Sequence, residues 1–186
     1  MKPPPVPFNQ RPVRRVDRQP IVIPLIGVLN MNKRLWIMAL VIGIAAAAPA
    51  YARSMTLTTE LSNYSGDGAY LAIYIADQAG AYQQTLWVAG RKSKYYRHLG
   101  GWARGSNLDS SEFDGRTGAS VLKGRTLSTT VEIADNLIDA GYQILIDSSV
   151  EDKRDIRNDV SVPLTQANSA KAVSGRGYIK AFSFTL

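Results

Sequence analysis

The stretch that decides the fold is "AYLAIYIADQAGAYQQTLWVA", residues 69–89. Its first part, 69–77, is apolar at almost every position, as in the central strand of a sheet. Its last part, 82–89, alternates between polar and apolar residues, which is typical of a half-buried strand. Only "QAGA", 78–81, separates the two parts. The sequence therefore predicts a β-hairpin over 69–89, with its first strand inside a sheet.

Outward from this hairpin, the same alternation predicts further strands at residues 55–62, 126–134, 142–150, 160–164 and 177–186. Residues 93–106 break the alternation and predict a short helical segment, which Gly100 and Gly101 should keep from becoming long. We expect loops at 105–119 and 136–141, and a charged hairpin loop at 151–159. The expected fold is an all-β, Ig-like β-sandwich of about seven strands with one short helical insertion.

The beginning of the chain has the pattern of an export signal. In "MNKRLWIMALVIGIAAAAPAYA", residues 31–52, two basic residues precede an apolar run and a small-x-small cleavage site. We interpret 31–52 as a signal peptide, 53–186 as the mature domain, and 1–30 as an extension in front of the true start at Met31. The alternatives are a membrane anchor, for which the apolar run is short, and a longer signal anchor that includes "IVIPLIGVL".

The excess of positive charge lies in this leader. The whole chain carries 22 Lys and Arg against 15 Asp and Glu, whereas residues 53–186 carry 15 against 14. A nucleic-acid-binding domain needs a basic face of its own. The composition therefore gives no support for a nucleic-acid partner, and it does not specify an oligomeric state.

The mature domain is poor in catalytic residue types. It has no Cys, and His98 is its only His, so we expect no metal site built on thiolates or imidazoles. The acids of 151–159 are interleaved with basic residues and indicate a solvated loop; a calcium site there would lack the EF-hand pattern. We expect no enzyme acting through its own side chains, and any redox chemistry would need a borrowed cofactor.

One short stretch suggests such a cofactor. "DGRTGAS", residues 114–120, resembles the acceptor motif of covalently flavinylated proteins such as the C subunit of the sodium-pumping NADH:quinone reductase. The resemblance implies that an FAD:protein FMN transferase joins FMN to Ser120 through a phosphoester. The remaining motif positions would be recognised by the transferase: Asp114, Gly115, Thr117, Gly118 and Ala119. In that family Thr is the commoner acceptor, and Ser supplies the same hydroxyl.

A broader resemblance covers most of residues 55–165. The segments 70–104, 114–120 and 139–154 are similar to a bacterial family of periplasmic Ig-like domains of unknown function. That family is associated with flavin transferases and with PepSY-type membrane proteins. The resemblance implies a periplasmic location and a membrane-bound PepSY-type redox partner.

A tethered flavin needs a surface on which its isoalloxazine ring can lie. Tyr95, Tyr96 and Trp102 lie in the helical interruption and are candidates for stacking, although adjacent tyrosines should point in different directions. The basic residues around these aromatics and around the motif are candidates to pair with the phosphoester and to favour reduced, anionic flavin. They are Arg91, Lys92, Lys94, Arg97, Arg104, Arg116, Lys123 and Arg125. The expected function is an exported electron carrier with FMN on Ser120. The alternatives are a non-redox periplasmic binding or assembly module, and an enzyme that uses the carboxylates of Asp109, Glu112 and Asp114.

Overall fold

The fold is known from a computed structural model, which describes residues 51–186. The expected extension 1–30 and almost all of the expected signal peptide 31–52 lie outside the described residues. The described elements are β1 (Ala52–Leu61), β2 (Tyr70–Ala76), β3 (Tyr82–Ala89), η1 (Ser93–His98), α1 (Gly100–Gly105), η2 (Ser110–Glu112), β4 (Thr117–Gly118), β5 (Thr126–Ala134), η3 (Asp135–Leu137), β6 (Gln143–Ser149), β7 (Ile156–Pro163), η4 (Gln166–Asn168) and β8 (Ile179–Thr185).

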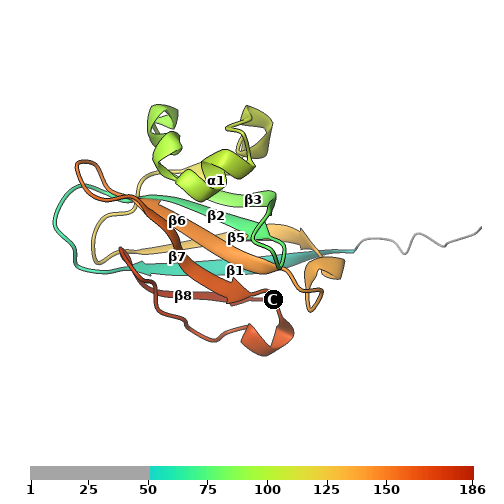
Figure 1. Ribbon diagram of the computed structural model, residues 1–186. Helices are drawn as coiled ribbons and strands as arrows, with labels where there is room; N and C mark the ends of the chain where they lie inside the picture. The colour runs from blue at the N-terminus through green and yellow to red at the C-terminus, as the bar shows by residue number, and fades with distance from the viewer. Residues whose placement is uncertain (1–50) are drawn as a thin grey trace, which may run out of the picture. The chain divides into compact units, whose positions relative to one another are not determined.

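The strands form two sheets that pack face to face, as Figure 1 shows. One sheet has the order β5-β1-β8 and the other the order β4-β3-β2-β6-β7. Every named strand pair is antiparallel except β3 with β4, which is parallel. The predicted all-β sandwich with a short helical insertion is confirmed, and β3 and β5 coincide with the strands predicted at 82–89 and 126–134.

Two boundaries were predicted wrongly. The stretch 105–119 is not all loop, because Thr117–Gly118 pairs with the end of β3 and adds an eighth strand. The charged loop is shorter than 151–159, because β7 begins at Ile156. The start of β7 contains a register shift, and Asn158 within it has a positive φ of 50°. Such a bulge hides the period of two from a sequence pattern.

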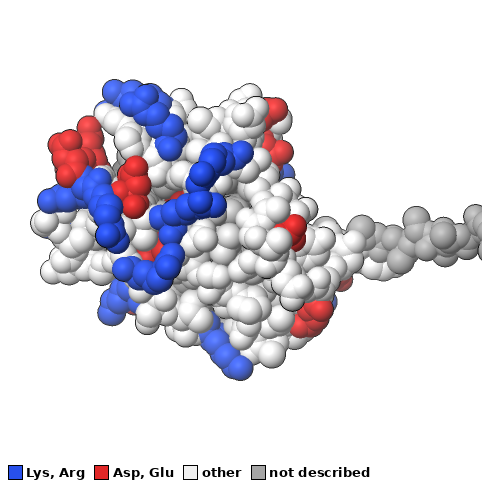
Figure 2. Space-filling model, viewed as in Figure 1, with Lys and Arg blue, Asp and Glu red and all other residues white. Residues whose placement is uncertain are grey.

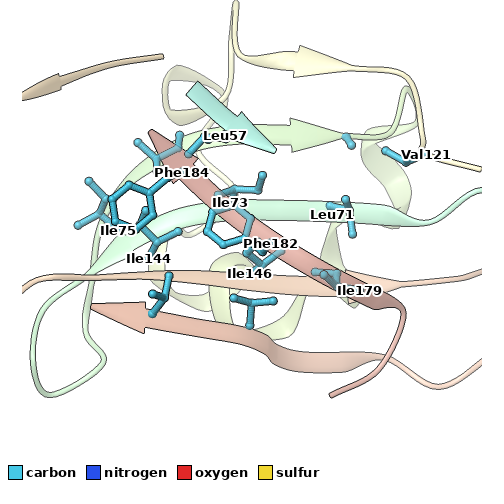
Figure 3. Packing of buried hydrophobic residues seen from close by; sticks show 14 of the residues in the cluster. Leu57, Leu71, Ile73, Ile75, Val121, Ile144, Ile146, Ile179, Phe182 and Phe184 are labelled. Carbon is cyan, nitrogen blue, oxygen red and sulfur yellow. The ribbon is translucent and has the colours of Figure 1, made fainter. Parts of the chain in front are cut away.

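The main core fills the space between the sheets. Alternate residues of β2, which are Leu71, Ile73 and Ile75, face it and meet Phe182 and Phe184 of β8 (Figure 3). All of these side chains are buried. Their burial between two apolar sheet faces is the main source of the stability of a sandwich.

Ala72, Tyr74 and Ala76 of β2 are also buried, because the helical insertion covers them on the outer face of the sheet (Figure 1). Tyr74 packs there with Tyr96, Leu99 and Trp102. We call this group, with Ala72, Ala76, Val88 and Leu145, the outer cluster. A strand covered on both sides needs apolar residues at nearly every position, which explains the continuous run in 69–77.

Candidate functional site

The motif 114–120 forms the edge of the five-stranded sheet. Gly115 turns the chain with a positive φ of 74°, which glycine adopts without strain. The following residues run beside the end of β3, where the Val88 amide donates to Arg116 O at 2.9 Å and the Gly90 amide donates to Gly118 O at 2.8 Å. A Cβ on Gly118 would come within 2.9 Å of the Trp87 ring. The motif is therefore a short ordered strand laid against Trp87.

Beyond this edge the chain crosses to β2. Val121 and Ala69 exchange both backbone hydrogen bonds, at 2.8 and 3.0 Å, and thereby fix Ser120 between two paired positions. Asp114, Thr117 and Ala119 are exposed, while Ser120 is half-buried. The motif thus presents its side chains at the surface, as a segment that another protein must recognise would have to do.

Ser120 borders a hollow of about 350 Å³. Gly68 forms part of its wall, and a Cβ at that position would come within 2.8 Å of Ser120 Oγ. The space that holds the Ser120 hydroxyl exists because residue 68 has no side chain. The hollow is lined by Asp67, Gly68, Tyr70, Arg91, Lys92, Ala119, Ser120 and Glu151.

Arg91 and Lys92 are the basic residues in this wall, and both are exposed. They begin the segment 91–104, which holds five Lys or Arg and no acid. Figure 2 shows charged side chains crowded toward the side of the molecule where the insertion and the 150–155 loop lie. The Ser120 hydroxyl therefore faces a hollow that offers positive charge, together with the two carboxylates of Asp67 and Glu151.

Arg116, the cation expected near the acceptor, lies elsewhere. Its Nη1 donates to Thr85 O at 3.4 Å and to Glu112 O at 3.3 Å. It lines a separate hollow of about 220 Å³ between β3 and β5, next to Trp87. Of the cations proposed from the sequence, Arg91 and Lys92 are the ones that line the hollow beside Ser120, because β3 ends beside the motif.

The three expected ring-binding aromatics also separate. Trp102 is fully buried, and its Nε1 donates to Thr85 Oγ1 at 2.8 Å. Tyr96 is buried, and its hydroxyl donates to Gly90 O at 2.7 Å. Both belong to the outer cluster, so they hold the insertion on the sheet and face no hollow. Tyr95 alone is half-buried at the surface.

Tyr95 lines a second hollow, of about 270 Å³, which adjoins the first through the shared residues Tyr70 and Glu151. His98 lies in its wall with Nδ1 at 3.0 Å from Asp155 Oδ2, and Ser149 donates to the other oxygen of Asp155 at 2.7 Å. The Asp155 carboxylate therefore lies between the His98 imidazole and the Ser149 hydroxyl. This is not the order of a Ser-His-Asp triad, in which the imidazole must contact the hydroxyl.

Two buried carboxylates were missed by the sequence reasoning. Asp147 is fully buried in β6 and accepts from the amides of Gly101 at 2.6 Å, Trp102 at 2.9 Å and Asn158 at 2.8 Å. It therefore caps α1 from another element. Asp is unfavourable in strands, so an Asp in the middle of the apolar strand predicted at 142–150 was a sequence signal of a buried carboxylate.

Asp159 is a second buried carboxylate, on the neighbouring strand β7, and it holds the segment before β8. It is 1% exposed and accepts from the Ser148 hydroxyl at 2.6 Å and from the amides of residues 176–179 at 2.6–3.2 Å. It was predicted to be part of a solvated loop, and that prediction is wrong. Its amide partners lie 17 to 20 residues away, where a local pattern does not reach.

Two tyrosines of the outer face have pKa values above the ordinary value for tyrosine. For Tyr74 the main cause is burial, and the nearby charge of Asp147 adds to it. For Tyr82 burial again comes first, followed by the hydrogen bond to Glu112. Both remain neutral phenols at physiological pH and act as hydrogen-bonding parts of the interface beneath the insertion.

Within residues 51–186, no group of three or more His, Cys, Asp or Glu is placed to hold a metal ion. None of the helices in this described part is long and apolar enough to cross a membrane.

Comparison with known families identifies the family of the domain. The chain belongs to the family described as "Predicted periplasmic protein (DUF2271)", whose profile matches residues 52–181. The predicted periplasmic location and the resemblance to a periplasmic family of unknown function are confirmed, while flavin attachment and the redox partner remain predictions. Comparisons with curated proteins and with solved structures each found no match.

Proposed function

We propose that this periplasmic protein is an electron carrier that holds FMN through a phosphoester to Ser120 Oγ. The observation that carries the proposal is the placement of the Ser120 hydroxyl. It lies at the end of an exposed edge strand, in a space left open by Gly68 and beside the cations Arg91 and Lys92. The motif thus supplies a nucleophile and an accessible backbone, and Gly68, Arg91 and Lys92 supply a place for an anion.

The residues present fit a phosphoester on three counts. Gly68 leaves room beside Oγ, because a Cβ there would lie 2.8 Å from it. Arg91 and Lys92 supply donors and charge for the phosphate oxygens. Gly118 and Ala119 carry little or no side chain, so a transferase can approach the backbone of the edge closely.

The attachment balances as a group transfer. Ser120 Oγ would form a bond to the flavin-side phosphorus of FAD, the pyrophosphate bond would break, and AMP would leave. The hydroxyl proton must pass to a base. Because an unassisted serine hydroxyl is a weak nucleophile at neutral pH, we assign that base to the FAD:protein FMN transferase.

When bound, FMN supplies one- and two-electron chemistry that the side chains lack. The chain's own part is to anchor the phosphate, shield the flavin and keep it at the surface for a partner. A membrane-bound PepSY-type protein is the partner that we propose, on the basis of the family resemblance. The protein would then be a substrate of the transferase and a carrier, with no turnover of its own.

The test is the intact mass of the protein exported from its native host. We expect a gain of one FMN less water, which Ser120→Ala abolishes and Ser120→Thr retains. Trypsin should release residues 117–123, cut after Arg116 and Lys123, with only two hydroxyls, those of Thr117 and Ser120. Fragmentation of this peptide distinguishes them, and Thr117→Val is the matched control that should keep a modifiable Ser120.

An unmodified mass, in a host shown to flavinylate another exported protein, would overturn the proposal. "DGRTGAS" would then be a surface edge strand only. The protein would be assigned to the alternative class, a non-redox binding or assembly module that presents the same hollows.

A further inference from the structure

The hollow beside Ser120 adjoins the hollow lined by Tyr95, and the two share Tyr70 and Glu151. We propose that Tyr70 and Tyr95 form the surface against which the isoalloxazine ring lies, while Arg91 and Lys92 hold the phosphoester. This inference rests on the proposed function, and it names the part of the protein that receives the ring.

The two rings form a prearranged aromatic corner. Their centroids are 5.4 Å apart and their planes are inclined at 65°, in the edge-to-face manner. The Tyr70 ring packs against Gly90, where the lack of a side chain leaves room for it, since a Cβ there would come within 2.0 Å of the ring. The Tyr95 hydroxyl donates to Glu151 Oε1 at 2.9 Å, which fixes the second ring. Aromatic walls held in this way favour a flat conjugated ligand.

The size and path of the two hollows suit a tethered flavin. They measure about 350 and 270 Å³, and together they fall in the range of sites for small organic ligands. The first holds the acceptor hydroxyl and the cations, and the second holds the aromatic corner. A phosphate at Ser120 would therefore lie in one hollow, and the ribityl chain would lead past Tyr70 into the other.

The aromatic corner lies beneath positive charge. Lys94 Nζ is 4.8 Å from the centroid of the Tyr95 ring, and Lys92 Nζ is 6.0 Å from it. On the opposite wall, the acids Glu151, Asp152 and Asp155 are accompanied by Lys153 and His98. Cations next to a flavin favour its reduced, anionic form over the neutral oxidised form. Lys94 is therefore the residue we expect to raise the reduction potential most directly.

The same geometry explains why neighbouring aromatics are unsuitable. Trp102 is fully buried and Tyr96 is 3% exposed, so a flavin could reach them only by displacing the insertion. Tyr96 instead packs edge-to-face against Tyr70, with centroids 6.5 Å apart, and supports the corner from inside. The ring-binding surface is thus formed by one residue of the insertion and one of β2.

The experiment uses full-length protein coexpressed with an FAD:protein FMN transferase and purified after export. Flavin occupancy at Ser120 is established first by intact mass. Flavin fluorescence yield and its quenching by iodide are then compared for wild type, Tyr95→Leu, Tyr95→Phe and Tyr142→Leu, a change at a half-buried tyrosine of the mature domain that lines neither hollow. Near-identical thermal unfolding of the variants shows that they are folded.

We expect weak fluorescence and slow iodide quenching in the wild type, because stacking on tyrosine quenches flavins and shields them. Tyr95→Leu should raise both several-fold, whereas Tyr142→Leu should leave both near the wild-type values. Tyr95→Phe should raise the fluorescence yield, because phenylalanine is not an electron donor to excited flavin, but should keep the slow quenching by iodide. In the same samples, Lys94→Gln should lower the reduction potential.

The two proposals fail in different ways. Flavin on Ser120 with the same fluorescence and iodide access in wild type and Tyr95→Leu overturns the ring surface and leaves the proposed function standing. If Tyr95→Leu unfolds, Tyr70→Leu provides the same comparison from the other wall. Protein that acquires no FMN overturns both proposals.

Discussion

The two faces of the five-stranded sheet are both covered at its central strand β2, but by different means. The inner face meets the three-stranded sheet through aliphatic side chains and phenylalanines such as Phe182 and Phe184 (Figure 3). The outer face meets the helical insertion through Tyr74, Tyr96 and Trp102, each of which also makes a hydrogen bond. The inner core excludes water over a large area, whereas the outer cluster combines a small apolar contact with specific polar bonds.

The contacts of the outer face position the candidate site, because they hold the helical insertion on the sheet. The insertion is short: η1 and α1 have six residues each. Helices of this length are not stable alone and depend on tertiary contacts. The buried carboxylate of Asp147 supplies them by accepting from the first amides of α1. Because the insertion carries Tyr95 and the basic segment, the outer cluster fixes the hollows next to Ser120.

The largest effect should come from breaking that anchor. Asp147→Asn replaces one acceptor oxygen by an amide that points donors at the amides of Gly101, Trp102 or Asn158. Unsatisfied buried donors cost about 1–3 kcal/mol each, so we expect a loss of about 3 kcal/mol in the free energy of unfolding. Urea denaturation followed by tryptophan fluorescence measures it.

A matched control separates burial from capping. Asp109 also caps a short helix, η2, by accepting from Ser111 N at 3.0 Å, but it is exposed. Asn is as good a cap as Asp, so Asp109→Asn should change stability by less than about 0.5 kcal/mol. Equal effects at the two positions would contradict the view that the outer face depends on buried polar anchors.

The inner face could be predicted from the sequence, and the outer face only in part. Alternation fixes which residues of a strand share a side, so Leu71, Ile73 and Ile75 must point the same way. The continuous apolar run of 69–77 indicated a central strand but not what covers its second face. Nothing local showed that Asp147 reaches Gly101, 46 positions away, because a buried polar group is satisfied by whichever chain the fold brings near.

The candidate site shows the same limit. The motif 114–120 was recognised as a unit because its residues are consecutive. Its companions are not: Gly68, Arg91 and Tyr95 come from other parts of the chain and meet Ser120 only through the pairing of β4 with β3 and of Val121 with Ala69. Arg116 is close to Ser120 in the sequence, but it lines the separate hollow beside Trp87.

A second, smaller effect should appear at alkaline pH. Burial raises the pKa of Tyr74 above its ordinary value of about 10. A group whose pKa is raised by folding contributes fully below the unfolded value, and its contribution is lost as the pH rises above it. We expect stability to fall above pH 10 by up to about 1.4 kcal/mol per pH unit through this residue.

Tyr74→Phe tests this expectation on the outer face. It removes the phenol that bonds Asn158 Oδ1 at 3.2 Å, so it should cost about 1 kcal/mol at neutral pH. Above pH 10 its stability should fall less steeply than that of the wild type, and the two curves should converge. Denaturant titrations at several pH values give both curves. Parallel curves would show that ionisation of Tyr74 does not limit the stability of the outer cluster.

The smallest effect on stability should come from a change at Gly68, at the edge of the candidate site. Gly68→Ala places a Cβ 2.8 Å from Ser120 Oγ and 3.2 Å from Ser120 Cβ. Gly68 is only half-buried, so the cost in unfolding free energy should be below about 1 kcal/mol. Ser120 must nevertheless move, and FMN incorporation by the transferase, measured by intact mass over time, should slow markedly.

Gly100→Ala is the matched control, since a Cβ at Gly100 meets no atom within 4 Å. Equal incorporation into both variants would show that the space beside Gly68 is not what prepares Ser120 to receive the flavin. Slower incorporation into Gly68→Ala alone would show that a site can be disabled without disturbing either buried face of the sheet.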